Sequence, residues 1–282
     1  MNAPVTKRSL SAKTEYFGED LAPGVRLRRL HPGGLNGPNG ELQFDYPGGH
    51  GWSEIVMLGD QNEKFIYGMP EIRMPANQFW PMHWHDCWTV VLVLEGKLQI
   101  GDWYMDKHDV FVSAPSVEYG PLLVGSNGCR ILEIFGNLAL SPGGYAPEYH
   151  DHPILRHGDH AFKEREGVNL RNVGNNCLSL EGADGMWKTS LAPGWSWDLG
   201  DPSDPERGVI RDARLAPGET MPAKHRGDWY GALILDGSME VEGRTLVKDD
   251  MVVARRDSTV PAMTAGKDGV HLLENFRTAA AL

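Results

Sequence analysis

The sequence predicts an all-β protein of two tandem barrels that arose by duplication of one domain, and three observations predict it. The chain has 282 residues, which is more than one domain usually needs and suits two domains of ordinary size. Its 34 glycines and 19 prolines interrupt the sequence too often for long helices and favour short strands joined by turns. An internal repeat then divides the chain into two similar parts.

The repeat relates residues 81–135 to residues 222–276 without a gap, at a constant offset of 141. Similar but non-identical residues, such as Glu95 and Asp236, are also paired by this offset. The identical pairs fall at turn and core positions: Pro81/Pro222, Trp88/Trp229, Leu92/Leu233, Leu94/Leu235, Gly96/Gly237, Asp109/Asp250, Val112/Val253, Gly128/Gly269, Leu132/Leu273, Glu133/Glu274 and Phe135/Phe276.

Each copy contains the same series of short apolar strands. In the first copy, the strand expected at 89–94 is followed by the turn residues Glu95 and Gly96 and by a second strand at 97–100. Several short strands separated by turn residues are typical of a sandwich or a barrel. The later strands of the first copy and those of the second are expected at 110–113, 130–135, 232–235, 239–241, 251–254 and 271–276.

The segments outside the repeat are rich in Gly, Pro, Asn and Asp, so we expect them to be arms and connections. The predicted organisation has four parts. These are an N-terminal arm at 1–50, a first barrel at 51–140, a connecting segment at 141–175 and a second barrel at 176–282.

Composition and charge narrow the possible functions. The 27 basic and 38 acidic residues give a net charge of -11, which disfavours a nucleic-acid partner because a phosphate backbone would be repelled. Residues 1–15 lack a secretory signal, and the sequence has no membrane-spanning apolar run. Cys87, Cys129 and Cys177 form neither a CxxC pair nor a disulfide framework. We therefore expect a cytoplasmic protein with reduced thiols and no membrane partner.

His83 and His85 are the strongest candidates for metal ligands. They lie two residues apart on an expected strand, so both side chains project from one face and suit a shared ion. The segment resembles the first sequence motif of the cupin superfamily, a His-x-His followed by Glu and then, seven residues later, by Gly. Counting back from Gly96, the Glu position of the motif is occupied by Thr89.

The second cupin motif is similar to the segment from His108 to Pro121, in which its final His position falls on Tyr119. The resemblance implies jelly-roll barrels (double-stranded β-helices) and a metal site. The usual cupin ligands are three His and one Glu, and only His83 and His85 match that set here. A third ligand is needed for firm binding. Tyr119 as a phenolate is the first choice and Glu118 the second, and either residue could also act in catalysis.

The second barrel is expected to bind no metal. At the positions of the four cupin ligands it has Lys224, Arg226, Tyr230 and Val260, and cations or hydrocarbon there would not hold a divalent ion. Its role would be structural. Alternatively, Lys224 and Arg226 could bind an anionic group inside this barrel.

Residues around the histidines are candidates for a substrate pocket, which would then suit an apolar or planar ligand. Aromatic side chains at these places could also be plain core. The predicted pocket residues are Phe79, Trp80, Trp88, Thr89 and Trp103. Cys87 is a possible soft ligand or a small buried hydrophobe. A rival metal cluster is formed by His150, His152, His157 and His160.

Three functions remain open. The first is an iron dioxygenase acting on a small aromatic or dicarbonyl compound, with Fe(II) held by His83, His85 and Tyr119 or Glu118. The second is a non-oxidative isomerase, lyase or hydrolase that uses zinc, nickel or manganese. The third is a non-catalytic cupin that binds a small molecule. The resemblance to cupins further implies a homodimer that pairs through barrel edges.

Overall fold

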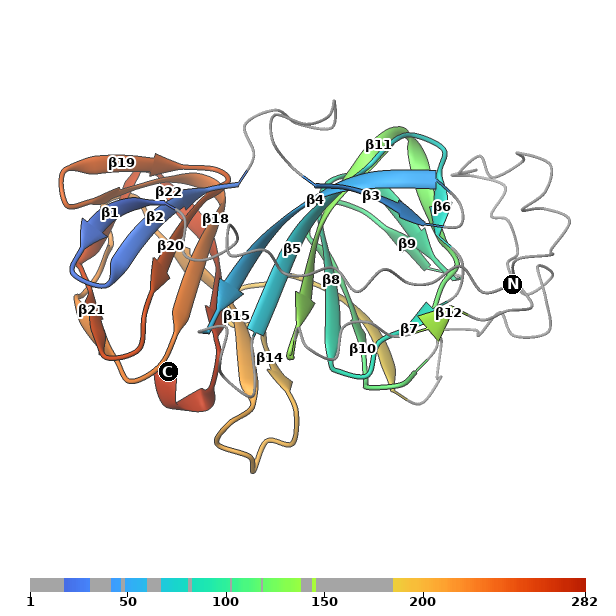
Figure 1. Ribbon diagram of the computed structural model, residues 1–282. Helices are drawn as coiled ribbons and strands as arrows, with labels where there is room; N and C mark the ends of the chain where they lie inside the picture. Colours follow the sequence, from blue (N-terminus) through green and yellow to red (C-terminus); the bar gives the residue numbers. More distant parts are fainter. Residues whose placement is uncertain are drawn as a thin grey trace, which may run out of the picture.

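The computed structural model describes residues 18–30, 42–46, 49–59, 67–80, 83–101, 103–117, 119–137, 144–145 and 185–282. These residues form β-strands and one short 3-10 turn, η6 (Ala279–Ala281). The strands make two barrels side by side (Figure 1). The all-β fold with two tandem barrels is therefore confirmed. Within the described ranges, no helix has the length and apolar character needed to cross a bilayer.

The first barrel is built on an antiparallel sheet of nine strands among the described residues. They are β3 (Leu42–Tyr46), β4 (Gly49–Leu58), β5 (Tyr67–Met74), β6 (Phe79–Trp80), β8 (Thr89–Ile100), β9 (Trp103–Met105), β10 (Asp109–Ser113), β11 (Leu122–Phe135) and β13 (Met186–Ser190). The strand order is β13-β10-β8-β11-β5-β4-β3, with β6 paired to β11 and β9 paired to β8.

The second barrel repeats this plan. Its nine described strands are β1 (Glu19–Ala22), β2 (Val25–Arg29), β14 (Ser196–Leu199), β15 (Gly208–Leu215), β16 (Thr220–Met221), β18 (Tyr230–Val241), β19 (Arg244–Val247), β20 (Asp250–Ala254) and β22 (Met263–Phe276). The order is β1-β2-β20-β18-β22-β15-β14, with β16 paired to β22 and β19 paired to β18. Two short ladders complete the barrels, β7 (His83–Trp84) with β12 (Gly144–Tyr145), and β17 (Lys224–Arg226) with β21 (Ser258–Val260).

The strand bounds reproduce the repeat seen in the sequence. Adding 141 to the bounds of β8, β10 and β11 yields those of β18, β20 and β22. The same offset relates β5 to β15 and β6 to β16, so the repeat begins at least at residue 67, earlier than the sequence identities revealed. Duplication therefore determined the backbone of both barrels, even where few side chains are shared.

Each barrel includes strands from the other half of the chain. β2 pairs with β20, so the N-terminal strands β1 and β2, drawn in blue in Figure 1, belong to the second barrel. Reciprocally, β13 pairs with β10 of the first barrel. The segment 1–50, expected to be an arm, thus supplies β1 and β2 to one sheet and β3 to the other.

Three hydrophobic cores explain the uninterrupted apolar run in β8. Val91 and Val93 point into the first barrel. Leu92 and Leu94 point the opposite way, into a core shared by both barrels, which we call the interbarrel core. A third core fills the second barrel. A strand buried on both faces needs apolar residues at every position rather than at alternate ones.

Gly96 shows why the turn between the two halves of β8 must be glycine. Its φ is +77°, and an added Cβ would lie 2.1 Å from the carbonyl oxygen of Gly128. We expect Gly96→Ala to destabilise the fold by about 2–4 kcal/mol, because a left-handed backbone and a steric clash are combined. The midpoint of urea unfolding measures this loss.

The matched control is Gly243→Ala. Gly243 has a φ of +72°, and nothing lies within 4 Å of its added Cβ. Only the backbone cost of about 1 kcal/mol should remain there. Equal losses for the two variants would contradict the steric argument.

Candidate metal centre

His83 and His85 enter the first barrel on a short segment that the backbone fixes on both sides. The amide of His83 donates to the carbonyl oxygen of Tyr119 at 3.1 Å, and the amide of Tyr119 donates back at 2.9 Å. On the other edge, His83 is paired with Tyr145. The two imidazole centroids lie 5.2 Å apart with their planes at 81°. The predicted pair is thus brought together inside the barrel.

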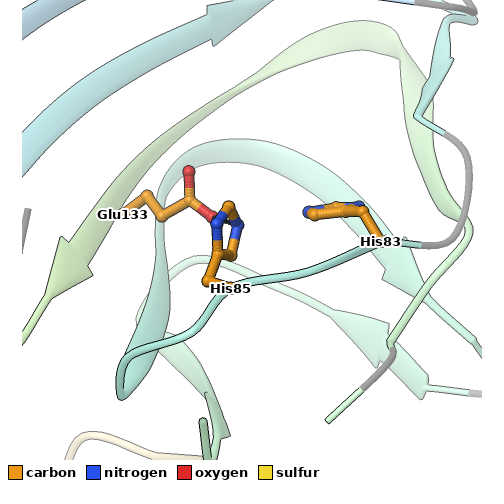
Figure 2. Close-up of side chains that lie close together, drawn as sticks. All are labelled: His83, His85 and Glu133. Atoms are coloured by element: carbon orange, nitrogen blue, oxygen red, sulfur yellow. Dashed lines mark ion pairs between the residues drawn. The ribbon is translucent and has the colours of Figure 1, made fainter. Parts of the chain in front are cut away.

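Glu133 joins the two histidines from strand β11, which belongs to the main sheet of the first barrel. Donor atoms of His83, His85 and Glu133 all lie within 4.8 Å of one another, and Figure 2 shows the Glu133 carboxylate beside the ring of His85. In the sheet register, Glu133 lies opposite Val91, and Thr89 lies opposite Phe135. The cupin motif would have placed its Glu on β8, at the position of Thr89. Here the carboxylate comes instead from Glu133 on β11, which is the diagonal cross-strand neighbour of Thr89.

The Glu133 carboxyl is held in its charged form. Burial raises its pKa, but a hydrogen bond from His85 and the charges of His85 and His83 outweigh burial, and the hydroxyl of Tyr119 adds to them. The net pKa of Glu133 is lowered. Its Oε1 lies 3.5 Å from Nε2 of His85 and accepts a hydrogen bond of 3.1 Å from the Tyr119 hydroxyl. The group is therefore a buried anion that faces two imidazoles.

Tyr119, predicted as the third ligand, lies at the site and is fully buried. Its ring centroid is 4.5 Å from that of His83 and 4.9 Å from that of Phe111. The Tyr119 hydroxyl donates a hydrogen bond to Glu133, so in this arrangement the tyrosine is a protonated phenol. Tyr119 as a metal ligand stays a prediction. Glu118, the second choice, lies outside the described residues.

The predicted pocket residues fall into separate groups. Trp80 is buried with its ring centroid 6.4 Å from that of His83. The Thr89 hydroxyl donates to the carbonyl of Cys87 at 3.2 Å. Trp103 contacts Phe111 at 6.2 Å between centroids, in the core of the first barrel.

Trp88 lies elsewhere, on the other face of the sheet. It stacks on Trp187 with 5.9 Å between centroids and packs against the interbarrel core, away from the histidines. The side chain of Phe79 is outside the part of the chain whose side chains are described.

Of the other candidate metal ligands, the structure describes Cys87 but not the four histidines between residues 150 and 160. Cys87 is buried, and burial raises the pKa of its thiol to about 11; its sulfur does not belong to the cluster of His83, His85 and Glu133. His150, His152, His157 and His160 lie outside the described residues.

In the second barrel, an arginine lies where the first barrel has His85. The Arg226 guanidinium is 4.1 Å from the centroid of Tyr230 and 3.9 Å from the carboxylate of Glu274. Glu274 is the repeat partner of Glu133, and it accepts hydrogen bonds from Tyr230 at 2.8 Å and from Arg211 at 2.8 and 2.6 Å. The arginines therefore neutralise the buried carboxylate here. Arg226 also donates to the carbonyl of Ala281 at 2.8 Å.

Sequence reasoning did not assign Glu133 to the site, although a signal was present. The strand around it reads Ile131-Leu-Glu-Ile-Phe135, and the repeat has Glu274 in the same frame. A carboxylate inside an apolar strand is costly to bury unless a cation or a metal pairs with it. Its presence in both copies was the indication that such a partner lies inside each barrel.

The three donors fit a divalent metal ion. Ligand atoms about 2.1 Å from one ion lie roughly 3–4 Å apart from each other, and the 3.5 Å between His85 and Glu133 falls within that range. Two neutral imidazoles and one carboxylate are ordinary ligands for first-row transition metals. This His-His-Glu cluster could therefore hold a divalent metal ion, and it does not specify which one.

No protein-family model and no curated protein sequence matches the chain. Solved structures do resemble it. A candidate dioxygenase from Nostoc punctiforme aligns with a TM-score of 0.62 at 16% identity, covering 93% of this chain and 86% of that one. Oxalate decarboxylase from Lactobacillus farciminis, in complex with formate, aligns with 0.51 at 11%, covering 85% and 84%. The pirin YhhW from E. coli, in complex with nickel(II), aligns with 0.50 at 11%, covering 89% and 98%.

Proposed function

Because the chain has the two-barrel cupin fold of these structural neighbours, we propose that it is a metal-dependent cupin enzyme, an iron dioxygenase acting on a small aromatic or dicarbonyl compound. The observation that carries the proposal is the convergence of His83, His85 and Glu133 inside the first barrel. Fold alone would not support a reaction, since cupin-like barrels serve many functions.

Two histidines and one carboxylate are the ligand set of non-haem Fe(II) oxygenases, which leave several coordination positions open. Iron bound there would supply a site where O₂ and a substrate with two oxygen donors can meet. The candidate dioxygenase from Nostoc punctiforme is the neighbour with this chemistry in its name, and it supports the proposal at the level of the fold.

The side chains around the ligands have definable tasks. Tyr119 holds Glu133 through its hydroxyl at 3.1 Å, which fixes the carboxylate in one orientation. Phe135 packs against His85 at 4.8 Å between centroids, and Trp80 lies beside His83. These apolar rings pack against the imidazoles and restrict their orientation.

A second candidate is a non-oxidative isomerase, lyase or hydrolase that uses zinc, nickel or manganese. The Tyr119 hydroxyl favours it, since a phenol within hydrogen-bonding distance of a carboxylate can pass a proton to a substrate. The pirin in complex with nickel(II) is a neighbour that fits this alternative. A cupin that only binds a small molecule is the third possibility.

Metal analysis and oxygen consumption test these alternatives. Protein purified without a histidine tag and reconstituted with Fe(II) is expected to hold close to one iron. It should then consume O₂ with a member of a panel of catechols, hydroxy-aromatic acids and diketones. Less than about a tenth of an equivalent of any transition metal would overturn both enzyme proposals. Firm metal binding without O₂ consumption would favour the non-oxidative alternative.

A further inference from the structure

The two barrels contact each other through two charged clusters that the repeat makes equivalent. In the first cluster, Arg130 of β11 is buried against Glu71 of β5, with 2.5 Å between Nε and Oε1. Its two terminal nitrogens reach across to Asp249 of the second barrel at 2.9 Å each. This contact is a bidentate ion pair between the barrels.

The second cluster is found by adding 141 to positions 71 and 130 and by subtracting 141 from position 249. Asp212 takes the place of Glu71, His271 that of Arg130, and His108 that of Asp249. The His271 Nε2–H donates to Asp212 at 2.5 Å, as Arg130 donates to Glu71. The ring of His108 then meets the ring of His271 edge-on, with 5.0 Å between centroids. One of the two equivalent ion pairs has therefore been replaced by two imidazoles.

The two contacts respond differently to protons. Arginine and aspartate attract each other throughout the physiological pH range. The ring of a neutral His108 packs against the ring of His271, whereas a proton on His108 places a positive charge in this contact between the barrels. Imidazoles change charge closer to neutral pH than any other unperturbed side chain.

We propose that the contact between His108 and His271 is an acid-sensitive joint, which holds the two barrels together at neutral pH and weakens when His108 takes up a proton. The paired contact of Arg130 with Asp249 acts as the pH-independent half of the same interface. The joint lies apart from the three candidate metal ligands, so the inference does not depend on the proposed reaction.

The surroundings of His108 support this proposal. Burial lowers its pKa, Lys107, His271 and Arg214 lower it further, and Asp236 raises it, with a result of about 4 instead of 6.5. Asp236 is itself 3.6 Å from Lys107. Between pH 6.5 and about 4, the unfolded chain holds a proton that the folded protein does not bind. Stability is therefore full above this window and falls as the pH falls through it.

The test exchanges the acid-sensitive contact for the pH-independent one. The double variant His108→Asp with His271→Arg recreates the ion pair of Arg130 with Asp249. An aspartate fits the backbone, because His108 and Asp249 have φ values of 71° and 72°. From pH 7 to pH 5, the unfolding equilibrium constant, measured by urea titration, should rise about fivefold more in the wild type than in the double variant, after allowing for solvent screening of the half-buried ring.

Two further variants keep the test decisive. His108→Asn removes the titrating group without adding a charge, and it should lose the extra acid sensitivity even if the double variant folds poorly. Asp249→Asn on the equivalent side should lower stability by the same factor at both pH values. Parallel pH profiles for wild type, double variant and His108→Asn would overturn the proposal, as would a His108 ring that titrates near pH 6.5 in the folded protein by NMR.

Discussion

Replacing His83 with alanine is expected to lower the affinity for Fe(II) or Co(II) at least about a hundredfold, because two remaining protein ligands hold a divalent ion weakly. Binding is measured by titration of the metal into protein freed of metal by a chelator. The matched control is Lys224→Ala, at the equivalent position of the second barrel, which should bind as the wild type does. Equal losses for both variants would contradict the difference between the barrels.

Two companion variants separate the third ligand from its neighbour. Glu133→Gln keeps the shape of the side chain but removes the charge, so it should also lose metal affinity. Tyr119→Phe removes only the hydroxyl that donates to Glu133, and at most about a tenfold loss is expected from a group that orients a ligand. If Tyr119→Phe abolished binding while Glu133→Gln bound normally, the tyrosine would be the ligand, as the sequence alone suggested.

Replacing Arg130 with methionine is expected to destabilise the protein by about 3 kcal/mol, in the range found when one partner of a buried ion pair is removed. Glu71 is fully buried, and it would lose the closer of its two ion pairs with arginine and keep the one with Arg73, whose Nε lies 3.4 Å from its Oε2. Asp249 would also lose its bidentate partner across the interface. Urea unfolding followed by circular dichroism measures the loss.

The control for this variant is Lys97→Met, which breaks an ion pair of similar type at the surface. Lys97 lies 3.5 Å from Asp106, and the side chains are 44% and 70% exposed, so less than about 1 kcal/mol should be lost. A loss at Arg130 as small as that at Lys97 would show that the buried cluster does not stabilise the interface.

Much of the fold could be predicted because its determinants are local or repeated. The turn at Gly96 and the alternation of apolar runs with Gly-rich turns are properties of neighbouring residues, and the offset of 141 required only comparison of the chain with itself. The pairing of β2 with β20 could not be predicted in this way. Strand pairing across more than two hundred residues depends on which sheet edge is vacant, and nothing in the local sequence of β2 specifies that.

The site could be predicted in part, and for a similar reason. His83 and His85 share a face because they are two residues apart on one short segment. Glu133 reaches them from another strand, through a register that depends on the bulges in the pairing of β11 with β8. The linear motif therefore showed that Thr89 stands where a cupin would have its Glu ligand. It could not show that Glu133 supplies the carboxylate instead.

The pairing of β2 with β20 also has a consequence for the order in which the protein is made. Val25 pairs with Ala254, so the ribosome must synthesise more than two hundred further residues before the N-terminal strands meet their partner. At typical rates of translation this takes on the order of ten seconds or more. During that time, β1 and β2 can pair with each other, but the edge of β2 that pairs with β20 has no partner. Completion of the second barrel is therefore coupled to the end of synthesis.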